Sequence, residues 1–443
     1  MDPVTALTTA VYLLGGPYLI YNYFHNPPMK LQDYLRHFYA IGKTGTGKST
    51  TIREGLIKPW VKKGYGLLAI ETKDRQTIDD IINCIPEQLH EKVIVFDPLD
   101  MARHGHYIGL NLLHGSRNIE TWETLICGEV LANLKRFFGE MAIQARSEDI
   151  LRNATLAVLE QEEGSLLEVY QMLTNAEYRE LAIRGLNNLV VKDYYESEFQ
   201  AGADALQAPK NKLRAFIINP LIRKIMCQLQ GLDVRQIIEQ GKILLVSLPK
   251  GVLGEDTTRL LAGTILSKAQ LAAQSRADMP IKERLKRPFM VIADEFQDYC
   301  NSSFNTFLEQ SRGFGISLVI AHQLLNQQGI NEGMIKSILG NVGNFLIFRV
   351  GPYDAPILSR IVKVKAKEQL YDENFLLNMQ NHTYLEKLLI DDKQHKPRLR
   401  CNSKPSFEGD FAESMRRYSV LKYGVPEFKI EGDIRRRMHN EYF

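Results

Sequence analysis

The chain has 443 residues, a formal net charge of +3 at pH 7 and 24% charged residues. Its length allows two or three domains, and so small a net charge excludes nucleic-acid binding driven by overall charge, which leaves only local basic patches for such contacts. Five scattered cysteines without a Cys-x-x-Cys pair exclude a disulfide framework and a cysteine zinc site, and they are typical of reduced, mostly buried thiols.

The first predicted element is an apolar segment at residues 4–24 that contains no Asp, Glu, Lys or Arg. It is long enough for one membrane crossing of about 20 residues, and the basic residues Lys30 and Arg36 that follow it favour a cytoplasmic location for the rest of the chain. The central Gly15-Gly16-Pro17 is also compatible with an apolar arm that docks on the body or on a neighbouring subunit. We therefore expect residues 1–28 to hold the chain at the cytoplasmic face of the inner membrane, or the chain to be cytoplasmic.

The next element is a predicted buried strand at residues 38–41, which runs directly into the sequence Gly-Lys-Thr-Gly-Thr-Gly-Lys-Ser. Glycines let backbone N–H groups turn inward around phosphates, and the following helix directs its positive N-terminus at them. Lys48 is expected on the phosphate oxygens and Ser49 on Mg²⁺. The predicted binding loop comprises Gly42, Lys43, Thr44, Gly45, Thr46, Gly47, Lys48, Ser49 and Thr50. The segment predicts a nucleotide-binding protein with ATP and Mg²⁺ as cofactors.

Beyond the loop, apolar runs alternate with helical patterns, as they do in α/β proteins with a mostly parallel sheet. Helices are predicted over residues 49–63 and 79–84. Strands are predicted at residues 66–70, 93–96, 243–248, 289–293, 317–320 and 345–348. Between about residues 118 and 229 the apolar residues recur at helical spacing instead, which predicts an all-helical insertion.

Two adjacent carboxylates, Asp294 and Glu295, follow the predicted strand at residues 289–293. We expect Asp294 to hold the hydration shell of Mg²⁺, and Glu295 to orient and deprotonate the attacking water. A fold that only bound nucleotide would need the first carboxylate and not the second, so the pair predicts hydrolysis. Gln323 follows the next predicted strand and is expected to sense the γ-phosphate or the water, with a helix cap as the alternative.

Taken together, the motifs resemble those of the conjugative coupling ATPases of type IV secretion systems, the TraG and TraD class within the HerA and FtsK superfamily. The segments that carry the resemblance are residues 36–42, 96–98, 109–111, 248–251, 294–297, 311–315 and 348–350. The resemblance extends from about Met29 to the C-terminus. One departure is Glu71-Thr72-Lys73-Asp74, where family members often have an aspartate followed by a proline and a small residue.

The resemblance implies a RecA-like P-loop NTPase core with an inserted all-α domain. The implied parts are an ATPase motor over residues 29–115 and 232–405, a helical insertion over residues 116–231 and a helical tail over residues 406–443. The implied activity is that of a hexameric motor that moves DNA by ATP hydrolysis. Its further implied partners are a relaxase and components of a type IV secretion channel.

The resemblance also suggests residues that act between subunits and on DNA. Arg312 is the implied trans-acting arginine finger and Arg349 the second candidate, with an ordinary surface salt bridge as the alternative for each. Sequence-independent DNA contacts are expected from the basic residues Lys210, Lys212, Arg214 and Lys250, with further clusters at residues 393–400 and 435–437. Each of these clusters could equally be a solvated face.

Two other functions remain open from the sequence. One is a soluble HerA-like translocase in DNA processing or defence. The other is a secretion ATPase that remodels protein, for which DNA would not stimulate hydrolysis.

Overall fold

The computed structural model describes residues 29–115, 122–139, 143–161, 163–199, 203–300, 303–327, 330–366 and 369–439. The predicted apolar segment at residues 4–24 lies outside the described residues. Within those ranges, no helix combines the length and the apolar character that a membrane crossing requires.

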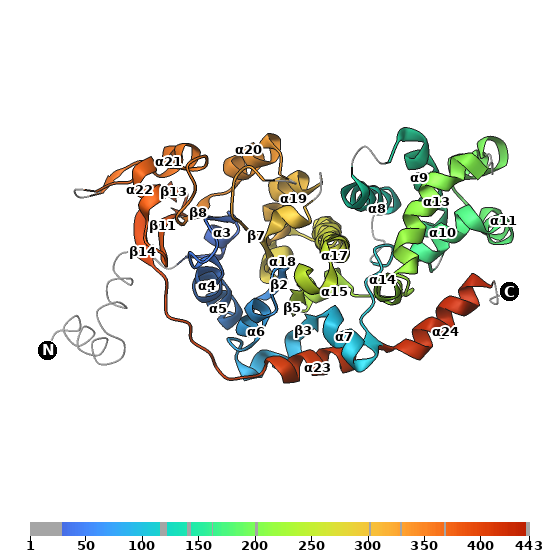
Figure 1. The fold of residues 1–443 in the computed structure, drawn as a ribbon, viewed down its shortest axis with the longest axis horizontal. Coiled ribbons are helices and arrows are strands. Elements are labelled where there is room, and N and C mark those ends of the chain that lie inside the picture. Colours follow the sequence, from blue (N-terminus) through green and yellow to red (C-terminus); the bar gives the residue numbers. More distant parts are fainter. Residues whose placement is uncertain are drawn as a thin grey trace.

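A nine-stranded sheet with the order β14-β11-β8-β1-β7-β6-β2-β5-β3 forms the centre of the molecule (Figure 1). Its strands are β1 (Phe38–Ile41), β2 (Gly66–Glu71), β3 (Val93–Phe96), β5 (Ile243–Ser247), β6 (Phe289–Asp294), β7 (Ile316–His322), β8 (Asn344–Ile347), β11 (Thr383–Lys387) and β14 (Arg398–Cys401). The strands from β8 to β3 are parallel, whereas β11 and β14 run antiparallel to their neighbours. The predicted mostly parallel sheet is confirmed, and the antiparallel pair is an addition that the sequence analysis does not contain.

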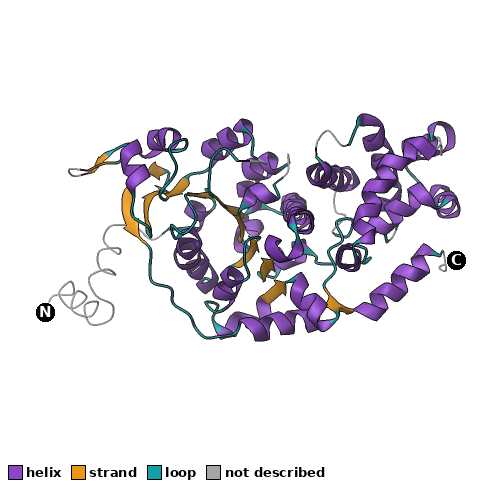
Figure 2. Cartoon of the chain, in the orientation of Figure 1, coloured by secondary structure: helices purple, strands orange, loops and turns teal. Residues whose placement is uncertain are grey.

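Helices cover both faces of the sheet (Figure 2) because successive strand residues point to opposite sides. Phe38 and Ala40 belong to one apolar core, and Tyr39 and Ile41 belong to the other. The first core is closed by α4 (Lys48–Ile52), α5 (Lys58–Lys62), α6 (Gln76–Ile82) and α23 (Ala412–Tyr423). The second is closed by α15 (Val234–Glu239), α17 (Glu255–Ser275), α19 (Phe304–Gln310), α20 (Glu332–Asn341), α21 (Ala355–Val362) and α22 (Glu373–Asn378).

Two predicted helices differ from the structure at their ends. The helix after the loop begins at Lys48 and runs to Lys62, with a π-helical turn at Arg53–Ile57 between α4 and α5. The helix predicted over residues 79–84 is α6, which begins earlier, at Gln76, and the Asp74 carboxylate just before it accepts a hydrogen bond from the Thr77 N–H at 3.0 Å. The polar residues at the start of this helix lie outside the apolar pattern that predicts it.

A group of helices inserted between β4 and β5 lies beside the sheet, and its described residues contain no strand (Figure 2). These helices are α8 (Trp122–Phe138), α9 (Ala145–Leu159), α10 (Leu166–Thr174), α11 (Ala176–Arg184), α12 (Leu189–Asp193), α13 (Ala203–Ile218) and α14 (Pro220–Met226). The chain segments that enter and leave the group cross at Gly109 and Gly231. The Leu232 N–H donates to the Gly109 carbonyl at 2.9 Å. A Cβ atom on Gly231 would lie 2.8 Å from the Asn111 nitrogen, so the crossing requires glycine there.

The C-terminal helices α23 and α24 (Glu427–Met438) join the two parts of the molecule (Figure 1). Helix α23 packs along the edge strand β3, where the Ser419 hydroxyl accepts a hydrogen bond from the Val95 N–H at 3.0 Å. Helix α24 reaches the inserted helices, where Arg437 pairs with Glu168 of α10 at 2.9 Å. The C-terminal helices therefore connect the sheet to the insertion.

The remaining short elements are α3 (Leu31–Tyr34), α7 (Pro98–His104), β4 (His106–Tyr107), α16 (Lys250–Leu253), α18 (Ile281–Lys286), β9 (Lys365–Ala366), β10 (Gln369–Leu370), β12 (Leu389–Ile390), β13 (Lys393–Gln394) and β15 (Val425–Pro426). Strand β15 pairs with β4, which fixes the start of α24 beside the entry to the insertion. All five cysteines carry thiols, and four of them are buried, with Cys401 exposed.

Candidate active site

The loop between β1 and α4 lies at the edge of the sheet where the parallel strands end. The register pairs Ile41 with His322 and Asp294 with Ala321, so the residues that follow β1, β6 and β7 meet at this edge. Within the loop, Gly45 and Gly47 have φ angles of 75° and 101°, a left-handed backbone that glycine adopts at no steric cost. The sequence therefore folds here into a tight turn that leads directly into α4.

A pocket of about 240 Å³ opens beside this loop. It is lined by Thr44, Gly45, Gly47, Lys48, Ser49, Thr50, Glu71, Lys73, Asp74, Thr77, Asp294, Glu295 and His382. The structure thus brings the predicted loop residues together with both predicted carboxylates. Gly42, Lys43 and Thr46 complete the loop behind this lining: the Lys43 carbonyl accepts the Thr46 hydroxyl at 2.7 Å.

Lys48 and Ser49 occupy the first turn of α4, and both side chains turn back toward the loop and the sheet. The Lys48 ammonium donates to the Gly42 carbonyl at 2.5 Å and to the Lys43 carbonyl at 3.3 Å. The Ser49 hydroxyl donates to Asp294 Oδ2 at 3.1 Å. A hydroxyl and a carboxylate held side by side are hard oxygen donors of the kind that Mg²⁺ prefers.

Glu295 is held in a chain of hydrogen bonds that begins on the loop. The Thr44 hydroxyl donates to Gln323 Oε1 at 2.8 Å, and Gln323 Nε2 donates to Glu295 Oε1 at 2.5 Å. The second carboxylate oxygen accepts from Gln297 Nε2 at 2.7 Å. Glu295 itself has a φ angle of 49°, an uncommon backbone for a residue other than glycine and one that is frequent at functional sites. The carboxylate is therefore fixed in one orientation beside the pocket.

The pocket lining gathers the carboxyl groups of Glu71, Asp294 and Glu295. Burial, together with the neighbouring Asp294 carboxylate, raises the pKa of Glu71 from 4.5 to about 8. Burial and the Glu295 charge also raise the pKa of Asp294, while Lys48 opposes that rise. Burial lowers the pKa of Lys48. Crowded carboxyl groups of this kind fit a divalent cation, which would favour their ionised forms.

Glu71 is a lining residue whose role the sequence analysis leaves open. It ends β2, is buried, and accepts a hydrogen bond from the Lys73 N–H at 2.7 Å. The departure from the family pattern at residues 71–74 therefore lies within the pocket. Asp74 and Thr77 extend the lining onto the start of α6.

The two arginine candidates lie at opposite ends of the parallel strands. Arg349 follows β8 at the same edge as the loop, and its carbonyl accepts a hydrogen bond from the Lys43 N–H at 2.9 Å. Its Nε atom is buried and has no partner among the described residues. Arg312 is exposed on the turn Ser311–Phe314 that precedes β7, which places it at the edge where the strands begin. Arg312 therefore cannot reach the loop of its own chain.

The basic residues predicted to bind DNA are dispersed. Lys210, Lys212 and Arg214 lie on α13 of the insertion, and the Lys212 ammonium lies 5.7 Å from the centre of the Phe138 ring. Lys250 begins α16 and forms an ion pair with Asp298 at 2.8 Å, so its charge is already balanced within the chain. The structure does not bring this residue and the α13 cluster together.

One residue of the C-terminal basic cluster is excluded from DNA contact. Arg437 is buried and bonds both carboxylate oxygens of Glu168, at 2.9 and 3.0 Å. The prediction for this position is wrong because its neighbour in space is a carboxylate 269 residues away along the chain. Arg435 and Arg436 remain exposed.

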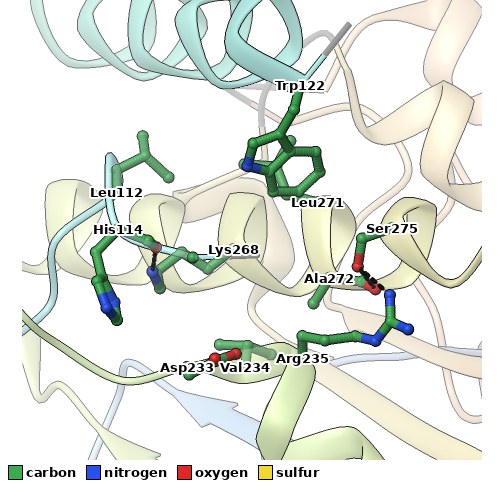
Figure 3. Close-up of a pocket in the computed structure, with 11 residues that line it drawn as sticks. Leu112, His114, Trp122, Asp233, Val234, Arg235, Lys268, Leu271, Ala272 and Ser275 are labelled. Atoms are coloured by element: carbon green, nitrogen blue, oxygen red, sulfur yellow. Dashed lines mark hydrogen bonds between the residues drawn. The ribbon is translucent and has the colours of Figure 1, made fainter. Parts of the chain in front are cut away.

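A second cavity lies at the junction of the sheet and the insertion, between α17, α15 and the start of α8 (Figure 3). It has a volume of about 20 Å³, which is room for about one water. Lys268 is buried beside it and donates to the carbonyls of Asn111 and His114 at 2.7 and 2.8 Å. Its size and its satisfied ammonium indicate a structural junction rather than a ligand site.

The fold matches solved structures of the plasmid coupling protein TrwB. Its complex with the non-hydrolysable GTP analogue GDPNP has a TM-score of 0.63 at 17% identity, over 86% of this chain and 89% of that chain. Its complex with ADP and Mg²⁺ has a TM-score of 0.61 at 17% identity, over 85% and 87%. The unbound monoclinic form of the conjugative coupling protein TrwBdeltaN70 gives 0.61 at 15% identity, over 86% and 88%. Neither a family model nor a curated protein sequence matches the chain.

At these identities the likeness establishes the fold. The predicted RecA-like core with a mostly parallel sheet is confirmed, and the resemblance to coupling proteins inferred from the motifs is confirmed at the level of the fold.

Proposed function

We propose that this chain is an Mg²⁺-dependent ATPase of the conjugative coupling type, which moves DNA toward a type IV secretion channel. The observation that carries the enzymatic part is the continuous hydrogen-bond chain from the loop residue Thr44 through Gln323 to Glu295. A loop that only bound nucleotide would not need a carboxylate fixed in this way. The GDPNP and the ADP with Mg²⁺ in the structures of TrwB support nucleotide as the ligand.

The residues around the pocket divide the reaction between them. Backbone amides of the loop and the Lys48 ammonium bind the β- and γ-phosphates. Ser49 and Asp294 would hold Mg²⁺, which when bound supplies positive charge against the phosphate oxygens. Glu295 accepts the proton of the attacking water. Gln323 holds the Glu295 carboxylate in a fixed orientation relative to the loop. Because Gln323 contacts both groups, it can report the state of the loop to Glu295.

The translocase part of the proposal rests on oligomerisation. Arg312 is exposed at the edge of the sheet opposite to the loop, so it can stabilise transferred phosphate only in a neighbouring subunit. A head-to-tail ring, which for this fold we take as a hexamer, supplies that neighbour. DNA would then pass through the ring and be held by backbone contacts. Arg214 is the exposed member of the α13 cluster, with Lys210 and Lys212 half-buried beside it.

The test is the ATPase activity of the purified, assembled protein with and without single- and double-stranded DNA of unrelated sequences. A translocase should be stimulated by DNA of any sequence, and the apparent affinity should fall by about 0.7 to 0.9 decades per decade of salt for each phosphate neutralised. The triple replacement of Lys210, Lys212 and Arg214 by alanine should weaken stimulation and leave basal turnover unchanged. DNA-independent hydrolysis by assembled rings would favour the protein-remodelling alternative.

Association with the inner membrane is the part of the proposal that separates a coupling protein from a soluble HerA-like translocase. If residues 4–24 are an anchor, the full chain should sediment with membranes and resist carbonate extraction. A shortened chain that begins at Met29 should then remain in solution with its ATPase activity intact. Carbonate extraction of the full chain would support the docked apolar arm. A relaxase and channel components would be the partners of the membrane-bound form.

A further inference from the structure

The antiparallel strands β11 and β14 place two polar residues against the phosphate-binding loop. Asn402 directly follows β14, and its Nδ2 donates to the Gly47 carbonyl at 2.8 Å. Its Oδ1 accepts the Thr51 hydroxyl at 2.9 Å. Its own N–H donates to the His382 carbonyl at 2.8 Å. The carboxamide of Asn402 thus ties the first turn of the helix after the loop to the start of β11.

His382 lies at that start and lines the pocket. Its N–H donates to the Thr46 carbonyl at 3.0 Å, and its φ angle of 62° is in the left-handed region that residues other than glycine rarely adopt. A Cβ atom placed on Gly47 would lie 3.2 Å from His382 Nδ1, which shows how closely the ring approaches the loop. The side chain is nevertheless exposed. A strained backbone thus presents an accessible imidazole to the pocket.

The direction in which a nucleotide lies in the pocket follows from the sheet. In the strand order, β6 and β2 lie on one side of β1, and β11 and β14 lie on the other. Ser49 contacts Asp294 at the end of β6, so the cation and the terminal phosphate belong on that side. The buried Glu71 carboxyl group lines the pocket at that end as well. The nucleoside of a bound nucleotide must therefore leave the loop toward β11, where His382 stands.

We propose that His382 contacts the nucleoside half of the bound nucleotide, and that Asn402 is a positioning residue that holds the loop and His382 together. This inference rests on the proposed nucleotide binding. An imidazole ring can stack on a base or hydrogen-bond a ribose hydroxyl, and neither partner exists in an inorganic polyphosphate. His382 should accordingly discriminate a nucleotide from bare phosphates, whereas Asn402 should affect both.

The experiment is calorimetric titration of the full chain with Mg-ADP and, separately, with inorganic tripolyphosphate and Mg²⁺. The variant His382→Asn removes the ring, and asparagine tolerates the left-handed backbone better than alanine does. His395→Ala is the control, because His395 directly follows β13 and is not part of the pocket lining. We expect His382→Asn to weaken the binding of Mg-ADP about tenfold and to leave the affinity for tripolyphosphate unchanged. His395→Ala should change neither affinity.

Asn402→Ala should weaken the binding of both ligands, because the Gly47 carbonyl and the Thr51 hydroxyl lose their hydrogen-bond partner. Unchanged Mg-ADP affinity in His382→Asn would overturn the inference. An equal loss of affinity for the two ligands would also overturn it, because His382 would then only support the loop. A loss confined to Mg-ADP in Asn402→Ala would overturn the positioning role. The proposed function fails separately, if the unaltered chain binds no Mg-ADP at all.

Discussion

Gln323 Nε2 donates a hydrogen bond to Glu295 Oε1 at 2.5 Å, across the ends of two adjacent parallel strands. The same carboxamide accepts from the Thr44 hydroxyl of the phosphate-binding loop through its oxygen. A carboxamide has one donor end and one acceptor end, so its orientation is fixed when both are used. Movement of the loop is therefore transmitted to the carboxylate that we assign to water activation.

Replacement of Gln323 by alanine should separate binding from turnover. Only the Thr44 hydroxyl of the loop loses a partner, and Lys48 keeps its contacts with the loop carbonyls, so the affinity for Mg-ADP should stay within about twofold. The kcat should fall by about a hundredfold because Glu295 loses its orientation. Gln88→Ala, an exposed glutamine in the turn Glu87–Lys92, is the control and should have no effect. A loss of affinity that matches the loss of kcat would make Gln323 a binding residue instead.

The variants Lys48→Ala and Glu295→Gln should block ATP hydrolysis in different ways. Loss of the Lys48 ammonium removes the cation that binds the transferred phosphate, so turnover should disappear. Glu295→Gln keeps the shape of the side chain and removes the base, so the protein should bind ATP and hydrolyse it slower by a few orders of magnitude. Equilibrium binding and single-turnover hydrolysis measure the two effects. Turnover at the wild-type rate in Glu295→Gln would remove this residue from the mechanism.

The sequence predicts that these residues lie together because its signals are local. The loop combines glycines with Lys48 and Ser49 between a strand and a helix, and Asp294 and Glu295 directly follow an apolar run. Each of the seven parallel strands is a short apolar run as well, and the structure contains all of them. In a parallel sheet the residues after such runs meet at one edge, so their proximity follows from the pattern.

The residues that sequence reasoning misses depend on contacts between distant segments. Asn402 lies 355 residues from Gly47, to which it donates, and nothing near residue 402 signals that contact. Strands β11 and β14 run antiparallel at one edge of the sheet and carry an ordinary mixture of polar and apolar residues. Arg437 belongs to a run of three arginines that is typical of a solvated face, and only the fold brings one of them to Glu168.

The pKa of Glu71 predicts a pH dependence of stability. Since its pKa is about 8 in the folded chain and 4.5 ordinarily, the folded state keeps a proton that the unfolded state releases. The associated stabilisation is complete below about pH 4.5 and is lost as the pH rises toward 8. The melting temperature of the nucleotide-free protein should therefore fall less steeply across this window in Glu71→Gln than in the unaltered chain. Glu413→Gln, at a side chain that is 86% exposed, should leave the slope unchanged. Parallel profiles for Glu71→Gln and the unaltered chain would contradict the assignment.

Arg437 should stabilise the contact between α24 and the inserted helices. Its replacement by alanine leaves the buried Glu168 carboxylate without its cation, which typically costs about 3–5 kcal/mol. Arg435→Ala, at an exposed position two residues earlier on the same helix, should cost less than about 0.5 kcal/mol. Denaturant unfolding of the two variants provides the comparison. Equal stabilities would mean that the Arg437 contact contributes nothing to the fold.

The position of Arg312 predicts that hydrolysis depends on a neighbouring subunit. Arg312 lies on the turn before β7, at the edge of the sheet opposite to the loop, so Arg312→Ala should bind Mg-ADP normally and lose turnover by about a thousandfold or more. When this variant is mixed with Lys48→Ala protein, some interfaces pair an intact arginine from one chain with an intact loop from the other. Activity should therefore return in mixed rings, although each variant is inactive alone. Arg349→Ala is the parallel test, and because the Arg349 backbone contacts the loop of its own chain, it should not be rescued in the same mixture. Absence of recovery in rings shown to contain both chains would mean that Arg312 acts structurally, and rescue of Arg349→Ala alone would transfer the role to that residue.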